Sequence, residues 1–128
     1  MTILKINTHS REVMIDITEE VKSAIKSSGI KDGICTVFVP HTTAGVTINE
    51  NADPDVKDDI IRGLDEIIPN IRFKHMEGNS DAHIKSALVG NSANLIVENG
   101  EIQLGTWQGI YFCEFDGPRS RKVYIKVI

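Results

Sequence analysis

Apolar and polar residues alternate with a period of two in the first part of the chain, as in half-buried β-strands. Residues 3–8 and 12–17 predict two strands, separated by the polar turn His9-Ser10-Arg11. Residues 33–39 and 44–49 predict a second pair of strands, and the segment from Pro40 to Thr43 lies at their junction.

Three segments show helix signals instead. The first runs to Ser28 and ends before Gly29, with Thr18 expected as its N-cap residue. The second begins with Asp53 as N-cap and Pro54 in the first turn, and it ends at Pro69. Its apolar residues recur at helical spacing: Val56, Ile60, Leu64, Ile67 and Ile68. The third is expected over residues 81–89, capped by Ser80 and closed by Gly90.

The last third of the chain returns to strands. The Asn99-Gly100 pair predicts a tight hairpin turn, because both residues tolerate the positive φ angles that such a turn needs. The strand over residues 110–115 is apolar on both faces, so helices and a neighbouring subunit are expected to cover it. The final strand alternates, with Val123, Ile125 and Val127 on its dry face. The pattern predicts one α+β domain over residues 1–128, with a largely antiparallel sheet.

Composition narrows the class of partner. The chain has 128 residues, a net charge of −4 and a pI near 5.5, so it lacks the basic balance typical of nucleic-acid binding. It has no apolar run of membrane-spanning length and no signal-peptide pattern. The cysteines Cys35 and Cys113 lie in apolar strands, which favours reduced, buried thiols. We therefore expect a cytoplasmic protein that binds neither nucleic acid nor membrane.

Polar residues gather in three places. In the first, His41, Thr42 and Thr43 interrupt two strand-like runs, and the hydroxyls or backbone amides could contact a ligand. The simpler interpretation is a β-bend beside an ordinary histidine. In the segment from His75 to His83, two histidines and two carboxylates could hold a metal ion. Asp81 and His83 are two positions apart, so their side chains diverge on a regular helix. Asp81 is therefore expected to orient a metal-binding histidine and not to bind the ion itself.

The same segment has two other interpretations. Asn79 and Ser80 lead into a helix whose free N–H groups could bind a phosphate, or the helix is simply capped beside a polar loop.

The third group of polar residues lies in a pair of turns near the C-terminus. Arg119 and Arg121 could bind a phosphate there, and Trp107 with Gln108 could contact a flat ring. A single tryptophan is more often a core residue.

Taken together, the motifs PHTTAG, NEN.DP, H.EGN.DAH, LG.WQ and E.DGPR.R resemble, in order and spacing, the YjbQ-like family. This resemblance covers residues from about Gly33 to the C-terminus. It implies an α+β sandwich that forms homotrimers. It also implies an activity described as secondary thiamine-phosphate synthase, in which a thiazole phosphate displaces pyrophosphate from a pyrimidine alcohol diphosphate.

Carried over by motif, the resemblance implies a metal site formed by His41, His75 and His83. The divalent ion would be zinc-like, with magnesium as an alternative for a diphosphate substrate. The candidate catalytic carboxylates are Glu50, Asp53 and Asp81, with Glu77 as a further orienting group. The candidate substrate-binding residues are Thr42, Thr43, Asn79, Ser80, Trp107, Gln108 and Arg121.

Two classes of function follow. The first is an enzyme acting on a phosphorylated heterocycle, with thiamine-phosphate synthesis as the nearest named activity. A metal-assisted phosphate-ester hydrolase is a variant of it, because a three-histidine site suits a softer ion than diphosphate departure normally uses. The second is a non-catalytic trimer that binds a metal or a metabolite.

Overall fold

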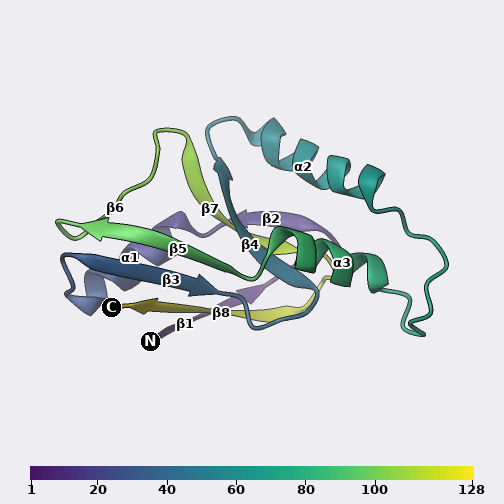
Figure 1. Cartoon of the computed structure of the whole chain (residues 1–128), viewed down its shortest axis with the longest axis horizontal. Coiled ribbons are helices and arrows are strands. Elements are labelled where there is room, and N and C mark those ends of the chain that lie inside the picture. The colour runs from purple at the N-terminus through teal and green to yellow at the C-terminus, as the bar shows by residue number, and fades with distance from the viewer.

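The computed structural model describes residues 1–128 as two packed antiparallel β-sheets with three helices (Figure 1). The larger sheet has the strand order β1-β8-β3-β5-β6, and the smaller sheet has the order β2-β7-β4. The strands are β1 (Thr2–Asn7), β2 (Val13–Asp16), β3 (Gly33–Phe38), β4 (Ala44–Glu50), β5 (Ser92–Glu98), β6 (Glu101–Ile102), β7 (Gln108–Glu114) and β8 (Ser120–Val127). The helices are α1 (Thr18–Ser28), α2 (Pro54–Ile67) and α3 (Ser80–Val89). This confirms the predicted α+β class.

The main core fills the space between the sheets and α1. Alternate residues of each strand point inward, so Cys35 and Val37 of β3 meet Ile110 and Phe112 of β7 in one buried cluster. Helix α1 adds Val21, Ala24 and Ile25 to the same cluster. Burial of this apolar area supplies the main force that holds the two sheets together.

The second face of β7 is covered within the chain. Tyr111 and Cys113 form a smaller buried cluster with Met14, Ala82 and Phe115. The half-buried apolar residues of α2 and α3 close this cluster from outside: Ile60, Ile61, Leu64 and Val89. The expectation that a neighbouring subunit covers one face of this strand was therefore wrong, because one face meets the larger sheet's core and the other meets helices.

Three of the turns that join successive strands are crossovers from one sheet to the other. Strand β1 pairs with β8 and β2 pairs with β7, although β1 and β2 are adjacent in sequence. The segments between β3 and β4, and between β7 and β8, likewise carry the chain from one sheet to the other. Only the β5–β6 pair is a true hairpin, with φ of 52° at Asn99 and 77° at Gly100. The three crossovers bring their polar turns to the same end of the molecule.

The helix ends follow the prediction in part. Asp53 caps α2 by accepting a hydrogen bond from the Asp55 N–H at 2.9 Å. Thr18, however, is the first residue of α1 and does not cap it; its hydroxyl donates to Asp16 Oδ1 at 2.5 Å. Ser80 likewise lies inside α3, whose N-cap residue is Asn79. None of the helices is both long and apolar enough to cross a membrane.

Burial predicts where truncation destabilises the fold. Ile110 is fully buried between the sheets, whereas Ile67 at the end of α2 is 69% exposed. We expect Ile110→Ala to lower the free energy of unfolding by about 2–5 kcal/mol, because it leaves a cavity. The matched control Ile67→Ala should change it by less than about 0.5 kcal/mol. Urea denaturation measures both, and similar losses would contradict this assignment of the core.

Candidate functional site

A polar cleft of about 420 Å³ lies at the end of the molecule where the crossovers meet. It is built from the β3–β4 crossover, the segment before α3, α3 itself and the β7–β8 crossover. Pro40 is the only lining residue without a polar side chain. The others are His41, Thr42, Thr43, His75, Glu77, Asn79, His83, Asp116, Arg119 and Arg121.

A buried ion pair forms the base of the cleft. Glu114 is fully buried, and its carboxylate accepts hydrogen bonds from Arg121 Nε at 2.9 Å and Nη2 at 2.5 Å. Thr8 also donates to it at 2.7 Å. Burial alone would raise the pKa of Glu114, but the bonds from Arg121 and Thr8 outweigh burial and lower it. The pair is therefore ionised and fixes the guanidinium in place.

Arg121 keeps donors for a ligand. Its Nε and Nη2 serve Glu114, and Nη2 also donates to the Thr43 hydroxyl at 2.8 Å. None of its hydrogen bonds within the chain uses Nη1. Because Arg121 lines the cleft, this remaining pair of N–H groups is available to an oxyanion.

A second carboxylate in the cleft is also committed to partners. Asp116 accepts hydrogen bonds from Asn79 at 2.8 Å and from Arg119 at 2.9 Å. Burial acts to raise the pKa of Asp116, and these two partners more than offset it, so the pKa is lowered. Asn79 thereby links the start of α3 to the β7–β8 crossover. Its Oδ1 atom is buried and has no hydrogen-bond partner.

The three histidines occupy different situations in the cleft. His41 accepts a hydrogen bond at Nε2 from the Lys122 backbone N–H, at 2.9 Å. Burial, and then the nearby Arg121 charge, lower the pKa of His41, which keeps its imidazole neutral. His75 and His83 lie edge to face with ring centroids 5.5 Å apart, and His75 Nε2 is 3.9 Å from a Glu77 carboxylate oxygen. Neither of these two rings is tied to the backbone as the ring of His41 is.

The imidazoles do not form the expected three-histidine metal centre. The Nε2 atom of His41 accepts a hydrogen bond from the Lys122 N–H, so its lone pair is not free to bind a metal ion. No group of three His, Cys, Asp or Glu side chains converges anywhere in the chain as metal ligands would. The arrangement of donors therefore fits an anion site better than a preformed metal site.

The structure separates the remaining predicted residues from the cleft. Asp81 points away from His83, as helix geometry required, and is buried against Arg11 at 3.2 Å. Burial favours the neutral acid, yet the Arg11 hydrogen bond prevails and lowers the pKa of Asp81. Asp81 also lies 3.7 Å from Lys85, whose ammonium is buried against Glu12 and Asp65. Asp81 thus holds α3 to the β1–β2 crossover.

Four candidate site residues lie away from the histidine cleft: Glu50, Asp53, Trp107 and Gln108. Gln108 pairs with Glu50, whereas Glu114 at the cleft pairs with Ala44, so the two pairs lie at opposite ends of β7. Seven strand residues separate the ends by roughly 20 Å. Trp107 precedes Gln108 and is 63% exposed, which corrects the core interpretation and places its ring away from the histidine cleft. Asp53 caps α2, and Ser80 adjoins the cleft without lining it.

Three further residues belong to the site although they were not expected there: Glu114, Thr8 and Asp116. Glu114 follows the apolar run IYFC on β7, and Thr8 lies at the end of β1. A carboxylate that ends an apolar strand is rarely buried without a paired cation, and that rule could have connected Glu114 with Arg121. Asp116, in the turn after β7, likewise accepts hydrogen bonds from two cleft residues, Asn79 and Arg119.

Comparisons with known proteins give a consistent result. Residues 2–128 match the family model described as UPF0047 protein YjbQ-like. The UPF0047 protein of Methanocaldococcus jannaschii is 60% identical, with 97% of this chain and 91% of the relative covered. The UPF0047 protein YugU of Bacillus subtilis is 58% identical, with 98% and 96% covered. A crystal structure of a YjbQ/UPF0047 family protein from Clostridium acetobutylicum superimposes with a TM-score of 0.98, at 56% identity and full coverage of both chains.

The neutral state of His41 predicts a pH effect. Its folded pKa lies below the ordinary value of 6.5, so its stabilising contribution is complete above that value and is lost as pH falls through the folded pKa. His41→Gln keeps an acceptor for the Lys122 N–H without titrating. We expect wild type to lose unfolding free energy more steeply than the variant between about pH 7 and about pH 5. Parallel urea-denaturation curves across this range would contradict the assignment.

Proposed function

The chain belongs to the UPF0047 YjbQ-like family, and from this premise and the geometry of the cleft we propose that it is an enzyme acting on a small phosphorylated compound. The observation that carries the proposal is the convergence of three imidazoles and two guanidinium groups in one polar cleft. The carboxylates of the buried Glu114 and the half-buried Asp116 are already paired with cleft residues. The remaining donors therefore favour an anionic ligand.

The phosphate would be bound by three groups with hydrogen-bond donors facing the cleft. Arg121 offers Nη1, and Arg119, half exposed at the rim, adds a second guanidinium. The exposed Thr42 adds a hydroxyl. Guanidinium and hydroxyl donors are a common set for phosphate oxygens because the charged hydrogen bonds are strong and directional.

His83 and His75 would supply the acid–base chemistry. In hydrolysis, the oxygen of a water molecule bonds to phosphorus as the bond from phosphorus to the leaving oxygen breaks. A positioned imidazolium donates a proton to the leaving oxygen, and a neutral imidazole accepts a proton from the water. His83 is held on α3, and His75 packs against its ring. His41 is bound to the Lys122 amide, so its role is to position the β3–β4 crossover rather than to transfer the proton.

Thiamine-phosphate synthesis remains the nearest named activity within this proposal. It shares the required step, departure of a diphosphate, but it also needs room and apolar contact for two heterocycles. The cleft of one chain has no apolar side chain besides Pro40, and Trp107 lies at the other end of β7. A small, strongly polar phosphate ester or diphosphate therefore fits better. Because the imidazoles do not converge as metal ligands, none of the steps proposed for the residues of the cleft uses zinc or magnesium.

The histidines provide the sharpest test of activity. We expect release of phosphate or diphosphate from a panel of phosphorylated compounds that includes the thiazole–pyrimidine pair. His83→Gln and His75→Gln should each lower kcat/KM about 100-fold or more, because they remove the acid–base group. His9, the fourth histidine, is exposed and outside the cleft, so His9→Gln is the matched control.

Assays run with chelator, zinc and magnesium in turn separate metal-dependent from metal-independent turnover. Absence of turnover above the no-enzyme rate in every condition would overturn the enzyme proposal and favour a binding protein. Equal activity of wild type and His83→Gln would overturn the assignment of the proton donor.

We also propose that the chain acts as a homotrimer, with the outer face of the larger sheet as the contact between copies. This face carries exposed apolar residues at paired positions: Ile34 opposite Ile96, and Phe38 and Ile3 each opposite Tyr124. The Phe38 and Tyr124 rings lie 6.3 Å apart. Exposed apolar side chains that gather on one face of a sheet are typical of a protein interface.

Light scattering tests the assembly. We expect a molecular mass in solution of about three times the 14.2 kDa of one chain. Ile34→Lys with Ile96→Lys should give folded monomers, because like charges would then face each other across the contact. Their native circular dichroism serves as the control. A monomeric wild type, or a double variant that remains trimeric, would contradict the proposed interface.

A further inference from the structure

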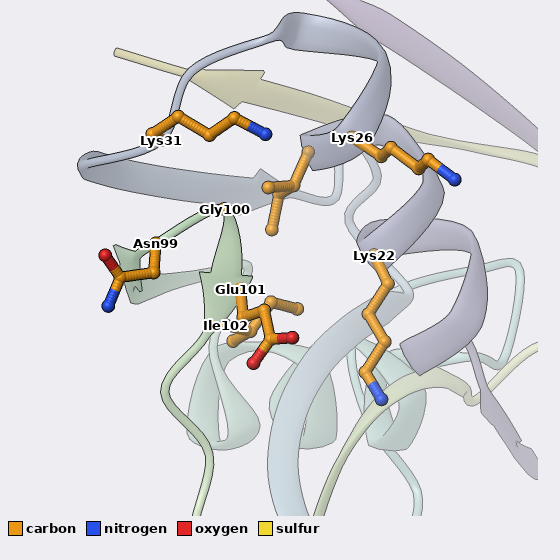
Figure 2. A pocket seen from close by; sticks show the side chains of 8 residues that line it. Lys22, Lys26, Lys31, Asn99, Gly100, Glu101 and Ile102 are labelled. Carbon is orange, nitrogen blue, oxygen red and sulfur yellow. The ribbon is translucent and has the colours of Figure 1, made fainter.

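A second cleft, of about 470 Å³, lies between α1 and the β5–β6 turn (Figure 2). It is at the opposite end of β3 from the histidine cleft, because β3 starts at Gly33 near this cleft and ends at Phe38 near Pro40. The length of β3 separates the two by roughly 20 Å. Its lining residues are Lys22, Ile25, Lys26, Lys31, Asn99, Gly100, Glu101 and Ile102.

The charges around this cleft are unbalanced. Three lysines and one glutamate line it, in a chain whose net charge is −4. Lys26 and Lys31 form no salt bridge, and Lys22 reaches only the exposed Glu19, at 3.6 Å. Most lysines of the chain likewise form no salt bridge, so this cleft is distinguished by the gathering of three lysines around one carboxylate. Such a local excess of positive charge favours a ligand that brings its own negative charge.

The wall of the cleft is held in place by the backbone. Gly100 N–H donates to the Lys31 carbonyl at 2.8 Å, and Asn99 N–H donates to Asp32 Oδ1 at 3.3 Å. Figure 2 shows the Lys31 side chain extending above Gly100. A Cβ atom at Gly100 would lie 3.2 Å from Lys31 Cδ, so glycine leaves the space in which this stem packs. The positive φ of 77° is the second reason for glycine here.

The cleft also has an apolar part. Ile25 is 1% exposed, and Ile102 of β6 packs against the same core cluster. The aliphatic stems of the lysines extend this surface while their ammonium groups stay in water. Such a site offers contact to an uncharged portion of a ligand as well as charge to its anionic portion. The histidine cleft has no comparable apolar surface.

We propose that this cleft is a second, separate binding site for a small molecule that carries a diphosphate or longer phosphate chain. The ammonium groups of Lys22, Lys26 and Lys31 bind the phosphates, and Glu101 accepts a hydrogen bond from a hydroxyl of the ligand. Ile102, which is partly exposed beside the buried Ile25, contacts the ligand's uncharged part. This site shares no residue with the histidine cleft and does not depend on the function proposed there.

Backbone amide NMR during titration with sodium diphosphate, and separately with ATP, tests the proposal in the presence of a chelator. We expect saturable shifts at Lys31, Asn99 and Gly100. The double variant Lys26→Gln/Lys31→Gln should raise the dissociation constant at least about tenfold. Equal affinities for the two probes would show that the phosphate chain is sufficient. Tighter ATP binding would show that the third phosphate or the uncharged part of the nucleotide also contributes.

A matched double variant controls for net charge. Lys57→Gln/Lys74→Gln removes the same two charges outside both clefts and should leave the titration unchanged. His83→Gln should also leave it unchanged, which distinguishes this site from the histidine cleft. Absence of shifts around Gly100, or equal weakening by both lysine double variants, would overturn the proposal.

Discussion

The buried ion pair between Glu114 and Arg121 is the interaction on which the histidine cleft depends. Glu114 ends β7 and Arg121 lies at the start of β8, so the pair joins the two sheets. Thr8 and Thr43 bind the same two side chains from the ends of the other crossovers. Removing one partner would leave the other charge buried, which costs about 3–5 kcal/mol in comparable proteins. The pair is therefore both a structural clasp and the support of the ligand-facing guanidinium.

The site exists because three crossovers end together. Two β-strands joined by a short turn usually pair, as β5 and β6 do, but three other turns here pass from one sheet to the other. The polar residues of the turns cannot be buried in the core, so they collect at one open end. Helix α3 then adds His83 from the side, anchored by the Asp81 contact to Arg11 and by the buried Lys85. Distant segments thereby supply one cleft.

Periodicity was sufficient to predict the elements, and local chemistry predicted the Asn99-Gly100 turn and the Asp53 cap. Strand pairing was not predictable, because a hairpin turn and a crossover can have the same length and composition. The motifs correctly brought His41, His75 and His83 into one cleft. They misplaced Glu50, Trp107 and Gln108, because a shared motif does not reveal that β7 separates its two ends. Glu114 was missed because its place at the end of an apolar strand was not used as a sign of a buried, paired carboxylate.

The central claim is that the histidine cleft binds a phosphate group without a preformed metal centre. Imidazole NMR measures this directly, by titration of the protein with inorganic phosphate in excess chelator. The account predicts that the signals of His41, His75 and His83 shift along one saturable curve while that of His9 stays constant. No shift at the three cleft histidines, or a shift only after a divalent metal is added, would contradict it.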